Sequence, residues 1–353
     1  LAVDKKFNVS VLGGGSFGTV LANLSAKNGL DTHLWVRDSE LALKINSESA
    51  KRDYHPELKL SKKICASDIL SECVCNADLI FIATPSSIIE NVVDRIKPLI
   101  KDDVVLISCT KGLINKPTRT ITDYIKDQLM EKPALERLGV LSGPNLAREI
   151  ADEKVAGSVI ASQSQHSKDL VINALESKIF KLYSSNDIKG VEYAGALKNI
   201  YAIGCGIGYQ LNIGENANGL IISRAMAEIS QFAVHKGAKP ITFLGLAGMG
   251  DLIATCTSKL SRNFSVGIEI AKGLSLDDAS QKIGQVAEGV NTLKIVYEEA
   301  IESNITMPIL SSLYTIIYQN QDPKSLLENL INHRDQLLSL IHISEPTIPV
   351  TIS

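Results

Sequence analysis

Short apolar runs alternate with amphipathic stretches through the first half of the chain. Segments with helical periodicity, such as 87–96 and 117–130, separate most of these runs. This alternation is typical of a mostly parallel, doubly wound sheet with helices on both faces. The predicted strands lie at residues 8–12, 32–36, 63–66, 79–83, 104–108, 140–141, 159–161 and 180–183.

The pattern changes near residue 188. Long segments of helical period follow and strand signals nearly vanish. We therefore predict an α/β protein with an N-terminal Rossmann-like domain (residues 1–187) and a C-terminal all-helical domain (188–335). The predicted helices of the second domain lie at 191–207, 219–236, 262–272 and 288–303.

The last residues, 336–353, alternate like a strand and contain two prolines after the helical pattern has ended. They resemble translated sequencing-adapter read-through. We interpret them as an irregular tail and a sequence artefact and exclude them from functional argument, the alternative being a genuine extension.

A glycine-rich motif, GGGSFG at residues 13–18, directly follows the first predicted strand and opens a predicted helix at 16–28. Gly13 allows a tight turn, Gly15 lets the backbone approach a diphosphate, and Gly18 lets the helix pack closely on the strand. The free N–H groups at the helix start favour an anion. The motif predicts a dinucleotide site, the alternative being a glycine-rich turn without a ligand.

The second predicted strand ends in Arg37 and Asp38. A carboxylate here favours NAD through the ribose hydroxyls, whereas an arginine accepts the 2′-phosphate of NADP. Because Arg37 comes first after the strand, we predict NADP as the favoured cofactor, with NAD tolerated.

The composition of the chain limits the kinds of partner that we expect it to bind. The formal net charge of the 353 residues is −3 and no basic stripe is present, so a nucleic acid is not expected. No apolar stretch is long enough to span a bilayer and no signal-peptide pattern opens the chain, so we expect a cytoplasmic protein. Six scattered cysteines lack metal-ligand spacing, and we expect reduced thiols and no metal.

Two lysines stand in surroundings that suggest chemistry. Lys111 follows a predicted strand and precedes Gly112, so its side chain is expected at the ligand-binding edge of the sheet. Lys198 lies in a helix rich in small and apolar residues, with Ala194 one turn before it. Burying a lysine is costly unless it is paired or functional, so we predict a functional Lys198 rather than a surface lysine.

Two later turns also carry candidate polar residues. Asp251 follows three glycines in six residues and is expected either at a site of close backbone approach or as N-cap of the helix from Leu252. Ser261 is a predicted N-cap. Arg262 would then grip a phosphate together with helix N–H groups, unless it is simply a surface arginine.

Together these segments resemble the bacterial-type NAD(P)-dependent glycerol-3-phosphate dehydrogenases over residues 7–333. The resemblance rests on five ordered motifs: GxGxxG from residue 13, TKGL from 110, SGPxxA from 142, EYxGxLKN from 192, and GLAGxGDL from 245 followed by SRN at 261–263. One departure is NANG at 216–219, where relatives often carry an arginine and where a glycine weakens a helix start.

The resemblance implies hydride transfer between sn-glycerol 3-phosphate and dihydroxyacetone phosphate, supplying glycerol phosphate for phospholipid synthesis. It implies that Lys198 is the general acid/base, with Lys111 and Asp251 beside the reacting oxygen. The implied substrate residues are Lys111, Gly143, Asn145, Lys198, Asn199, Asp251, Ser261, Arg262 and Asn263. The implied cofactor residues, besides Gly13, Gly15 and Gly18, are Ser16, Phe17, Arg37, Lys111, Ala147, Arg262, Val286 and Glu288.

Two alternatives stay open at this point. One is another dehydrogenase of the same architecture, of the 3-hydroxyacid, 6-phosphogluconate or ketopantoate type. The other is a non-catalytic NADP sensor, which has no need for Lys111, Lys198 and Asp251 together. In either dehydrogenase reading the partner is a small-molecule substrate, and we expect a homodimer.

Overall fold

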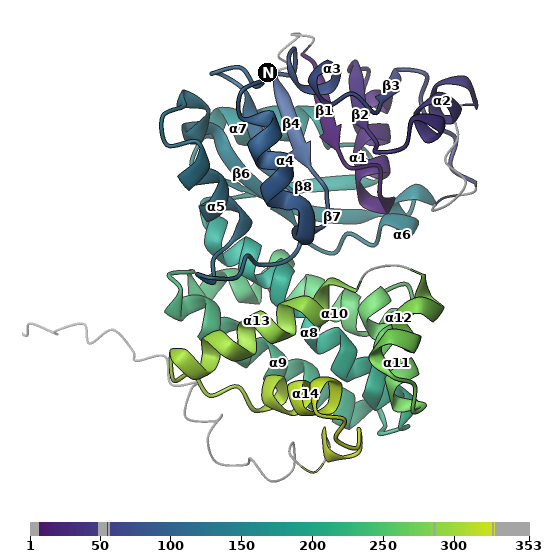
Figure 1. Cartoon of the computed structure of the whole chain (residues 1–353), viewed down its shortest axis with the longest axis vertical. Coiled ribbons are helices and arrows are strands. Elements are labelled where there is room, and N and C mark those ends of the chain that lie inside the picture. The colour runs from purple at the N-terminus through teal and green to yellow at the C-terminus, as the bar shows by residue number, and fades with distance from the viewer. Residues whose placement is uncertain (1–6, 49–54, 56, 285–286, 327, 329–353) are drawn as a thin grey trace, which may run out of the picture.

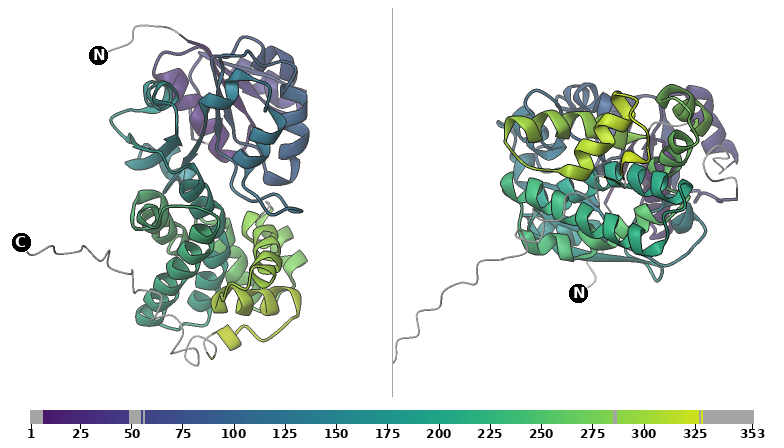
Figure 2. Two further views of the ribbon diagram at one scale, coloured as in Figure 1. Left: turned by 90° about the vertical axis from the view of Figure 1, so that its left-hand side faces the viewer. Right: turned by 90° about the horizontal axis from the view of Figure 1, so that it is seen from below.

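The computed structural model describes residues 7–48, 55, 57–284, 287–326 and 328. They form a sheet lobe stacked on a helical lobe along the long axis of the molecule (Figures 1 and 2). The fold class predicted from the sequence is confirmed. The strands are β1 (Val9–Leu12), β2 (Thr32–Trp35), β3 (Ile64–Ser67), β4 (Leu79–Ile82), β5 (Val105–Ser108), β6 (Leu138–Ser142), β7 (Ala156–Ser162) and β8 (Phe180–Ser185).

The eight strands form one sheet in the order β3-β2-β1-β4-β5-β6-β7-β8. All neighbours are parallel except β6 and β7. Strands β1, β4 and β5 are buried along their whole length, which explains their nearly continuous apolar sequences. The sequence predicted β6 and β7 too short because glycines and buried serines interrupt the apolar pattern at their ends. Ser158 Oγ donates to the Ser142 carbonyl (3.0 Å) and Ser162 Oγ donates to that of Leu138 (2.8 Å).

Helices cover both faces of the sheet and create two separate cores. One core lies under α1 and α7, and the other under α3, α4 and α5. The helices of this lobe are α1 (Ser16–Lys27), α2 (Ser39–Glu48), α3 (Leu70–Val74), α4 (Ile89–Ile96), α5 (Ile121–Gln128), α6 (Ala147–Ala151) and α7 (Gln165–Leu175).

Between residues 188 and 326, the described part of the chain contains no strand. Since β8 ends at Ser185 and the next helix begins at Ile188, we propose that the domains 1–187 and 188–335 divide here. The predicted tail at 336–353 lies outside the described residues. The main helices of this lobe are α8 (Ile188–Gln210), α9 (Glu215–His235), α10 (Asp251–Cys256), α11 (Arg262–Ala271), α12 (Leu276–Ile283), α13 (Glu288–Glu302) and α14 (Pro308–Tyr318).

Helix α8 is the centre of the helical lobe and is buried along almost its whole length. It crosses α11 at two glycines. A Cβ on Gly206 would collide with the Phe264 carbonyl, and a Cβ on Gly267 would collide with that of Ile203. This close crossing fixes the position of Lys198, which lies mid-way along α8.

The start of α9 differs from the sequence prediction. We expected a helix from residue 219 with a start loosened by Gly219, but α9 begins at Glu215 and continues through that glycine. A single glycine costs a helix only about 1 kcal/mol, and the apolar face of α9 that packs on α8 outweighs that cost.

A buried carboxylate caps helix α14. Glu228 of α9 is fully buried and accepts hydrogen bonds from the backbone N–H of Ile309 (2.7 Å) and Leu310 (3.1 Å) and from the Tyr201 hydroxyl (2.9 Å). These N–H groups have no partner within the first turn of a helix. Glu228 therefore joins α8, α9 and α14 in the interior.

Replacing Glu228 by alanine should lower the free energy of unfolding by about 3 kcal/mol, because it leaves three buried donors without an acceptor. Urea denaturation followed by circular dichroism measures the change. Glu302, exposed at the end of α13, is the matched control, and its alanine variant should stay within about 0.5 kcal/mol of the parent. Equal stabilities of the two variants would contradict this role of Glu228.

Candidate active site

The glycine-rich turn between β1 and α1 has the geometry that its sequence predicted. Gly13 adopts a φ of 119°, and a Cβ on Gly18 would collide with the Gly13 carbonyl. A Cβ on Gly15 would meet nothing within 4 Å, so space remains beside this backbone. Helix α1 begins at Ser16 without a side-chain cap. Its first N–H groups are therefore free to bind a diphosphate, and the turn fits a dinucleotide.

His55 is a neighbour of this turn that sequence reasoning missed. Its side chain is buried, and its Nε2 lies 3.1 Å from Ser16 Oγ and 3.0 Å from the Ser16 carbonyl oxygen. A carbonyl only accepts, so Nε2 carries a proton and donates to it. No local pattern around residue 55 indicates this contact, because it joins residues 39 positions apart.

The two charged residues after β2, Arg37 and Asp38, have different roles. Asp38 Oδ1 accepts a hydrogen bond from the Glu40 N–H (2.9 Å) at the start of α2, so this carboxylate acts as a helix cap. Arg37 is exposed two residues after the end of β2, which is the parallel neighbour of β1. Arg37 and the glycine-rich turn therefore follow the carboxyl ends of adjacent strands.

Three predicted residues meet where the lobes join. Lys198 Nζ of α8 donates to Asp251 Oδ1, and Lys111 Nζ from the loop after β5 lies 3.5 Å from Asp251 Oδ2. Asp251 is fully buried and the Lys198 side chain is 5% exposed, whereas that of Lys111 is 22% exposed. One carboxylate thus lies between two ammonium groups, and Lys111 has the greater access to solvent.

This arrangement changes the pKa of the Lys198 amine. Burial lowers the pKa of Lys198, the Asp251 carboxylate opposes that decrease, and the charge of Lys111 adds to it, so that the net pKa is about 7. An amine with a pKa near neutrality can both give and take a proton at physiological pH. The sequence prediction of a buried rather than snorkelling Lys198 is confirmed.

Of the two alternatives for Asp251, the one in which it caps the helix from Leu252 does not hold. Asp251 is itself the first residue of α10, and the position before it, Gly250, is helical. The preceding segment, Leu246–Gly250, forms a turn of π-helix that runs directly into α10. The Asp251 carboxylate is therefore directed to the two lysines and to the Thr255 hydroxyl one turn later (3.4 Å from Oδ1).

The other predicted substrate residues surround the α8–α11–α13 junction or the end of β6. Asn263 Oδ1 accepts from the Gly289 N–H (3.0 Å), and a Cβ on Gly289 would collide with the Asn199 carbonyl. Ser261 caps α11 as predicted, accepting from the Phe264 N–H (3.4 Å). Arg262 is exposed on the first turn of α11.

At the end of β6, Gly143 has a φ of 144°, and a Cβ there would lie 3.0 Å from the Cα of Ser158. Asn145 Nδ2 donates to Ser158 Oγ (3.0 Å). The Oδ1 atom of Asn145 is buried and has no hydrogen-bond partner among the described residues. Ala147 is the first residue of α6, whose N-terminus has no side-chain cap.

A hydrogen-bonded contact joins the two lobes beside the loop that carries Lys111. Glu288, at the start of α13, accepts from the hydroxyl (2.6 Å) and the N–H (3.3 Å) of Ser86, which follows β4. A Cβ on Gly112 would lie 2.7 Å from Ser86 Oγ, so a glycine is needed here. Val286, the other residue predicted in this late loop, lies outside the described residues.

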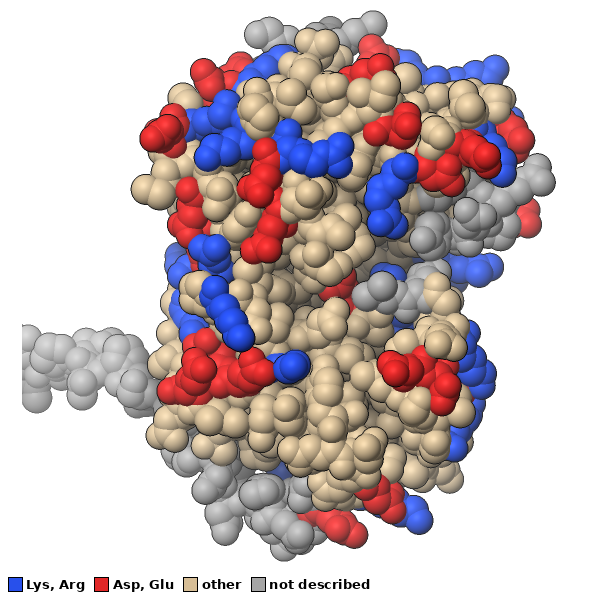
Figure 3. Space-filling view, in the orientation of Figure 1, with Lys and Arg blue, Asp and Glu red and all other residues tan. Residues whose placement is uncertain are grey.

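The surface between the lobes is hollowed on the face shown in Figure 3, and an acidic side chain is visible within the recess. Basic and acidic residues are interspersed over this face. The described residues include no group of three or more His, Cys, Asp or Glu side chains placed to hold a metal ion. Nor does any described helix have the length and apolarity that crossing a membrane requires.

Comparison with known families decides among dehydrogenases of this architecture. Residues 8–168 match the profile described as the NAD-dependent glycerol-3-phosphate dehydrogenase N-terminus, and residues 187–328 match that of its C-terminus. The chain belongs to this family. The resemblance found from the five sequence motifs is confirmed, and with it the assignment to NAD(P)-dependent oxidoreductases.

Curated members of the glycerol-3-phosphate dehydrogenase family are similar over nearly their whole length. The glycerol-3-phosphate dehydrogenase [NAD(P)+] of Alcanivorax borkumensis is 43% identical over 329 residues, covering 93% of this chain and 95% of that protein. That of Acinetobacter baumannii is 45% identical over 335 residues, covering 94% and 92%.

Solved structures of glycerol-3-phosphate dehydrogenases have a fold similar to that of this chain. The crystal structure of glycerol-3-phosphate dehydrogenase from Coxiella burnetii superposes with a TM-score of 0.87 at 32% identity, covering 93% of this chain and 99% of that one. A ketopantoate reductase from Ralstonia eutropha reaches a TM-score of 0.56 at 15% identity, which shows a shared fold alone.

Proposed function

We propose that the protein interconverts sn-glycerol 3-phosphate and dihydroxyacetone phosphate with NADP or NAD as hydride carrier. The observation that carries the proposal is the buried Lys198–Asp251 pair beside Lys111, at the junction of a dinucleotide-binding lobe and a helical lobe. Family membership supplies the substrate class, since the similar curated proteins are named for glycerol 3-phosphate.

The cofactor would lie across the carboxyl ends of the central strands. Its diphosphate would bind the turn formed by Gly13, Gly15 and Gly18, with Ser16 and Phe17 at the start of α1. Its ribose end would reach Arg37, and its nicotinamide end would approach Lys111 and Ala147, with Arg262 and Glu288 contributing from the helical lobe. The sequence resemblance adds Val286 to this set. When bound, the nicotinamide supplies or accepts the hydride.

The residues of the chain handle the proton. During reduction of the ketone, Lys198 donates its Nζ proton to the C2 oxygen, and during oxidation of the alcohol it takes that proton back. Asp251 orients the amine. Lys111, the more exposed cation, stabilises negative charge that develops on the same oxygen.

The substrate would be anchored at its phosphate end. Ser261, Arg262 and Asn263 lie at the start of α11, where a guanidinium and helix N–H groups can bind the same phosphate. Gly143, Asn145 and Asn199 would border the glycerol carbons. The unpartnered Oδ1 of Asn145 is suited to accept from a substrate hydroxyl.

Arg37 should favour NADP, because Asp38 is occupied as the cap of α2. Replacing Arg37 by alanine should raise the KM for NADPH about tenfold and change that for NADH by about twofold at most, since only NADPH carries the 2′-phosphate. Steady-state kinetics with each nucleotide measures both values. Arg95, an exposed arginine on α4, is the matched control. A parallel rise for NADH would contradict the assignment.

The activity itself is tested by assaying dihydroxyacetone phosphate reduction with NADPH and with NADH, following loss of the reduced nicotinamide. The proposal predicts turnover with the phosphorylated ketone and none with ketopantoate or a 3-keto acid. It also predicts no formation of NADPH from 6-phosphogluconate and NADP+. Cofactor binding without turnover of any of these would support a sensor instead.

We propose further that the protein acts as a homodimer in the cytoplasm and supplies glycerol phosphate for phospholipid synthesis. The cofactor and substrate, both water-soluble metabolites, support the location, and the family supports the pathway. Sedimentation equilibrium of the purified chain tests the dimer, with a monomer mass as the contrary result.

A further inference from the structure

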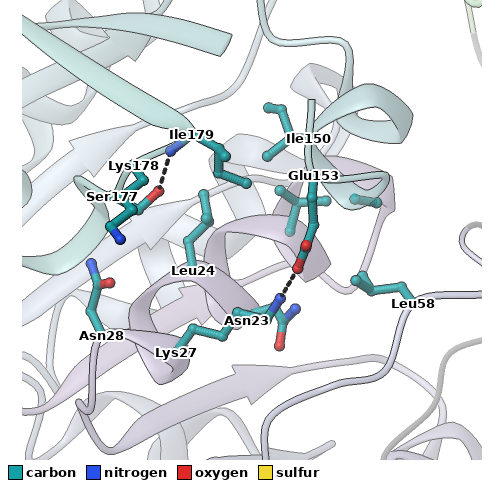
Figure 4. Close-up of a pocket in the computed structure, with 12 residues that line it drawn as sticks. Asn23, Leu24, Lys27, Asn28, Leu58, Ile150, Glu153, Ser177, Lys178 and Ile179 are labelled. Atoms are coloured by element: carbon teal, nitrogen blue, oxygen red, sulfur yellow. Dashed lines mark hydrogen bonds and ion pairs between the residues drawn. The ribbon is translucent and has the colours of Figure 1, made fainter. Parts of the chain in front are cut away.

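A pocket of about 310 Å³ lies beside the C-terminal half of α1, away from the candidate active site. Apolar side chains of Leu24, Ile150 and Ile179 turn toward one another within it (Figure 4). They come from α1, α6 and the loop before β8. Pockets that hold small organic ligands begin at about this volume and have a similar apolar lining.

Charged groups line the same pocket. Lys27 Nζ of α1 pairs with Glu153 Oε1 at 2.8 Å (Figure 4). Lys178, an exposed residue, also lines the pocket, and it has no ion pair with a carboxylate in the part of the chain that the structure describes. The carboxylate of Glu153 is already neutralised by Lys27, so the pocket carries one uncompensated positive charge.

The end of α6 places the Glu153 side chain at the pocket. Glu153 follows α6 with a φ of 59°, a left-handed conformation that glycine or asparagine usually supplies at the end of a helix. The turn is a Schellman motif, in which the Glu153 N–H donates to the Ile150 carbonyl (3.0 Å) and the Lys154 N–H donates to that of Glu149 (2.9 Å). From this position the Glu153 side chain reaches across the pocket to Lys27.

The pocket is separate from the proposed catalytic machinery. The diphosphate turn lies at Ser16, and Lys27 is 11 residues further along α1, which is about 17 Å at the rise of an α-helix. None of the proposed substrate or cofactor residues lines the pocket.

We propose that this pocket is a binding site for a small monoanion with an apolar body, such as an aromatic carboxylate. The apolar side chains of Leu24, Ile150 and Ile179 contact the body. The Lys178 ammonium binds the carboxylate of the ligand, and the Lys27–Glu153 pair closes one side.

Naphthoate is a suitable probe, and isothermal titration calorimetry of the full chain saturated with NADPH measures its binding. Cofactor saturation keeps the probe out of the dinucleotide site. We expect one saturable site with a Kd below about 1 mM. Naphthalenemethanol, which has the same apolar body without the charge, should bind about tenfold more weakly.

Two variants assign the site. Lys178→Glu should weaken naphthoate binding about tenfold or more, and Ala151→Trp, which fills the pocket, should abolish it. Lys294→Glu makes the same charge change at an exposed position of α13 and is the control. All three should keep wild-type dehydrogenase activity, which shows that they fold and separates this test from the proposed function. If Ala151→Trp does not fold, Lys178→Glu and the neutral alcohol still decide.

The proposal is overturned by an absence of saturable binding, by equal affinities for the acid and the alcohol, or by equal losses in Lys178→Glu and Lys294→Glu.

Discussion

Replacing Lys198 by alanine should lower kcat for dihydroxyacetone phosphate reduction by about three orders of magnitude, while the Kd for NADPH changes by about twofold at most. The buried position of Lys198 explains this expected loss. Lys198 is the buried amine with a pKa near neutrality, and its partner Asp251 cannot replace it as a proton donor to the substrate oxygen. The dinucleotide turn lies in the other lobe and keeps its N–H groups.

Two further variants separate proton transfer from the loss of a buried cation. Lys198→Arg keeps the charge but cannot release its proton at physiological pH, so its kcat should also fall by orders of magnitude. Lys236→Ala removes another ion-paired lysine of the helical lobe, bonded to Glu299, and should leave kcat near the wild-type value. Rapid-quench or steady-state assays with fluorescence titration of NADPH measure both quantities. Near-normal turnover in Lys198→Ala would remove Lys198 from its role.

Replacing Arg262 by alanine should raise the KM for dihydroxyacetone phosphate by about 50-fold, because charge-assisted hydrogen bonds to a phosphate contribute about 1.5–3 kcal/mol. A smaller rise in the KM for NADPH should accompany it, since Arg262 is also expected near the cofactor. The start of α11 should remain intact, because its cap is the Ser261 side chain.

Lys259 gives the matched control for Arg262. It lies three residues earlier, and its ammonium stacks 4.7 Å from the Tyr209 ring centroid rather than at the helix start. Lys259→Ala should change the KM for the phosphorylated substrate by less than about threefold, as expected for an exposed cation. Equal effects of the two substitutions would show that general positive charge, and not a phosphate site at Arg262, governs binding.

The parts of the fold that follow from local pattern could be predicted from the sequence. Buried parallel strands read as continuous apolar runs, so β1, β4 and β5 are evident. The glycine-rich turn is evident because the sterically demanding positions, Gly13 and Gly18, permit little else. Lys198 could be found because a lysine among small residues in a helix contradicts the solvation preference of its side chain.

Features that depend on distant partners could not be predicted in this way. Glu228 caps residues 81 positions away, and Glu192 on α8 accepts from the N–H of Thr122 (2.9 Å), 70 positions away on α5. His55 reaches the diphosphate turn across 39 residues. The sequence could not decide the role of Asp251, because an aspartate near a helix start is commonly a cap. In the structure its carboxylate instead pairs with two lysines from other segments.

The pH dependence of turnover tests the central claim most directly. A protonated Lys198 is required for ketone reduction, so kcat/KM for reduction should fall as pH rises through about 7, and kcat/KM for alcohol oxidation should rise over the same range. Asp251 raises the pKa of Lys198, so Asp251→Asn should move both transitions to lower pH. The shift between wild type and variant is decisive, because the substrate phosphate also titrates near pH 6. Profiles that do not depend on pH between about 6 and 9, or transitions that stay in place in Asp251→Asn, would contradict the account.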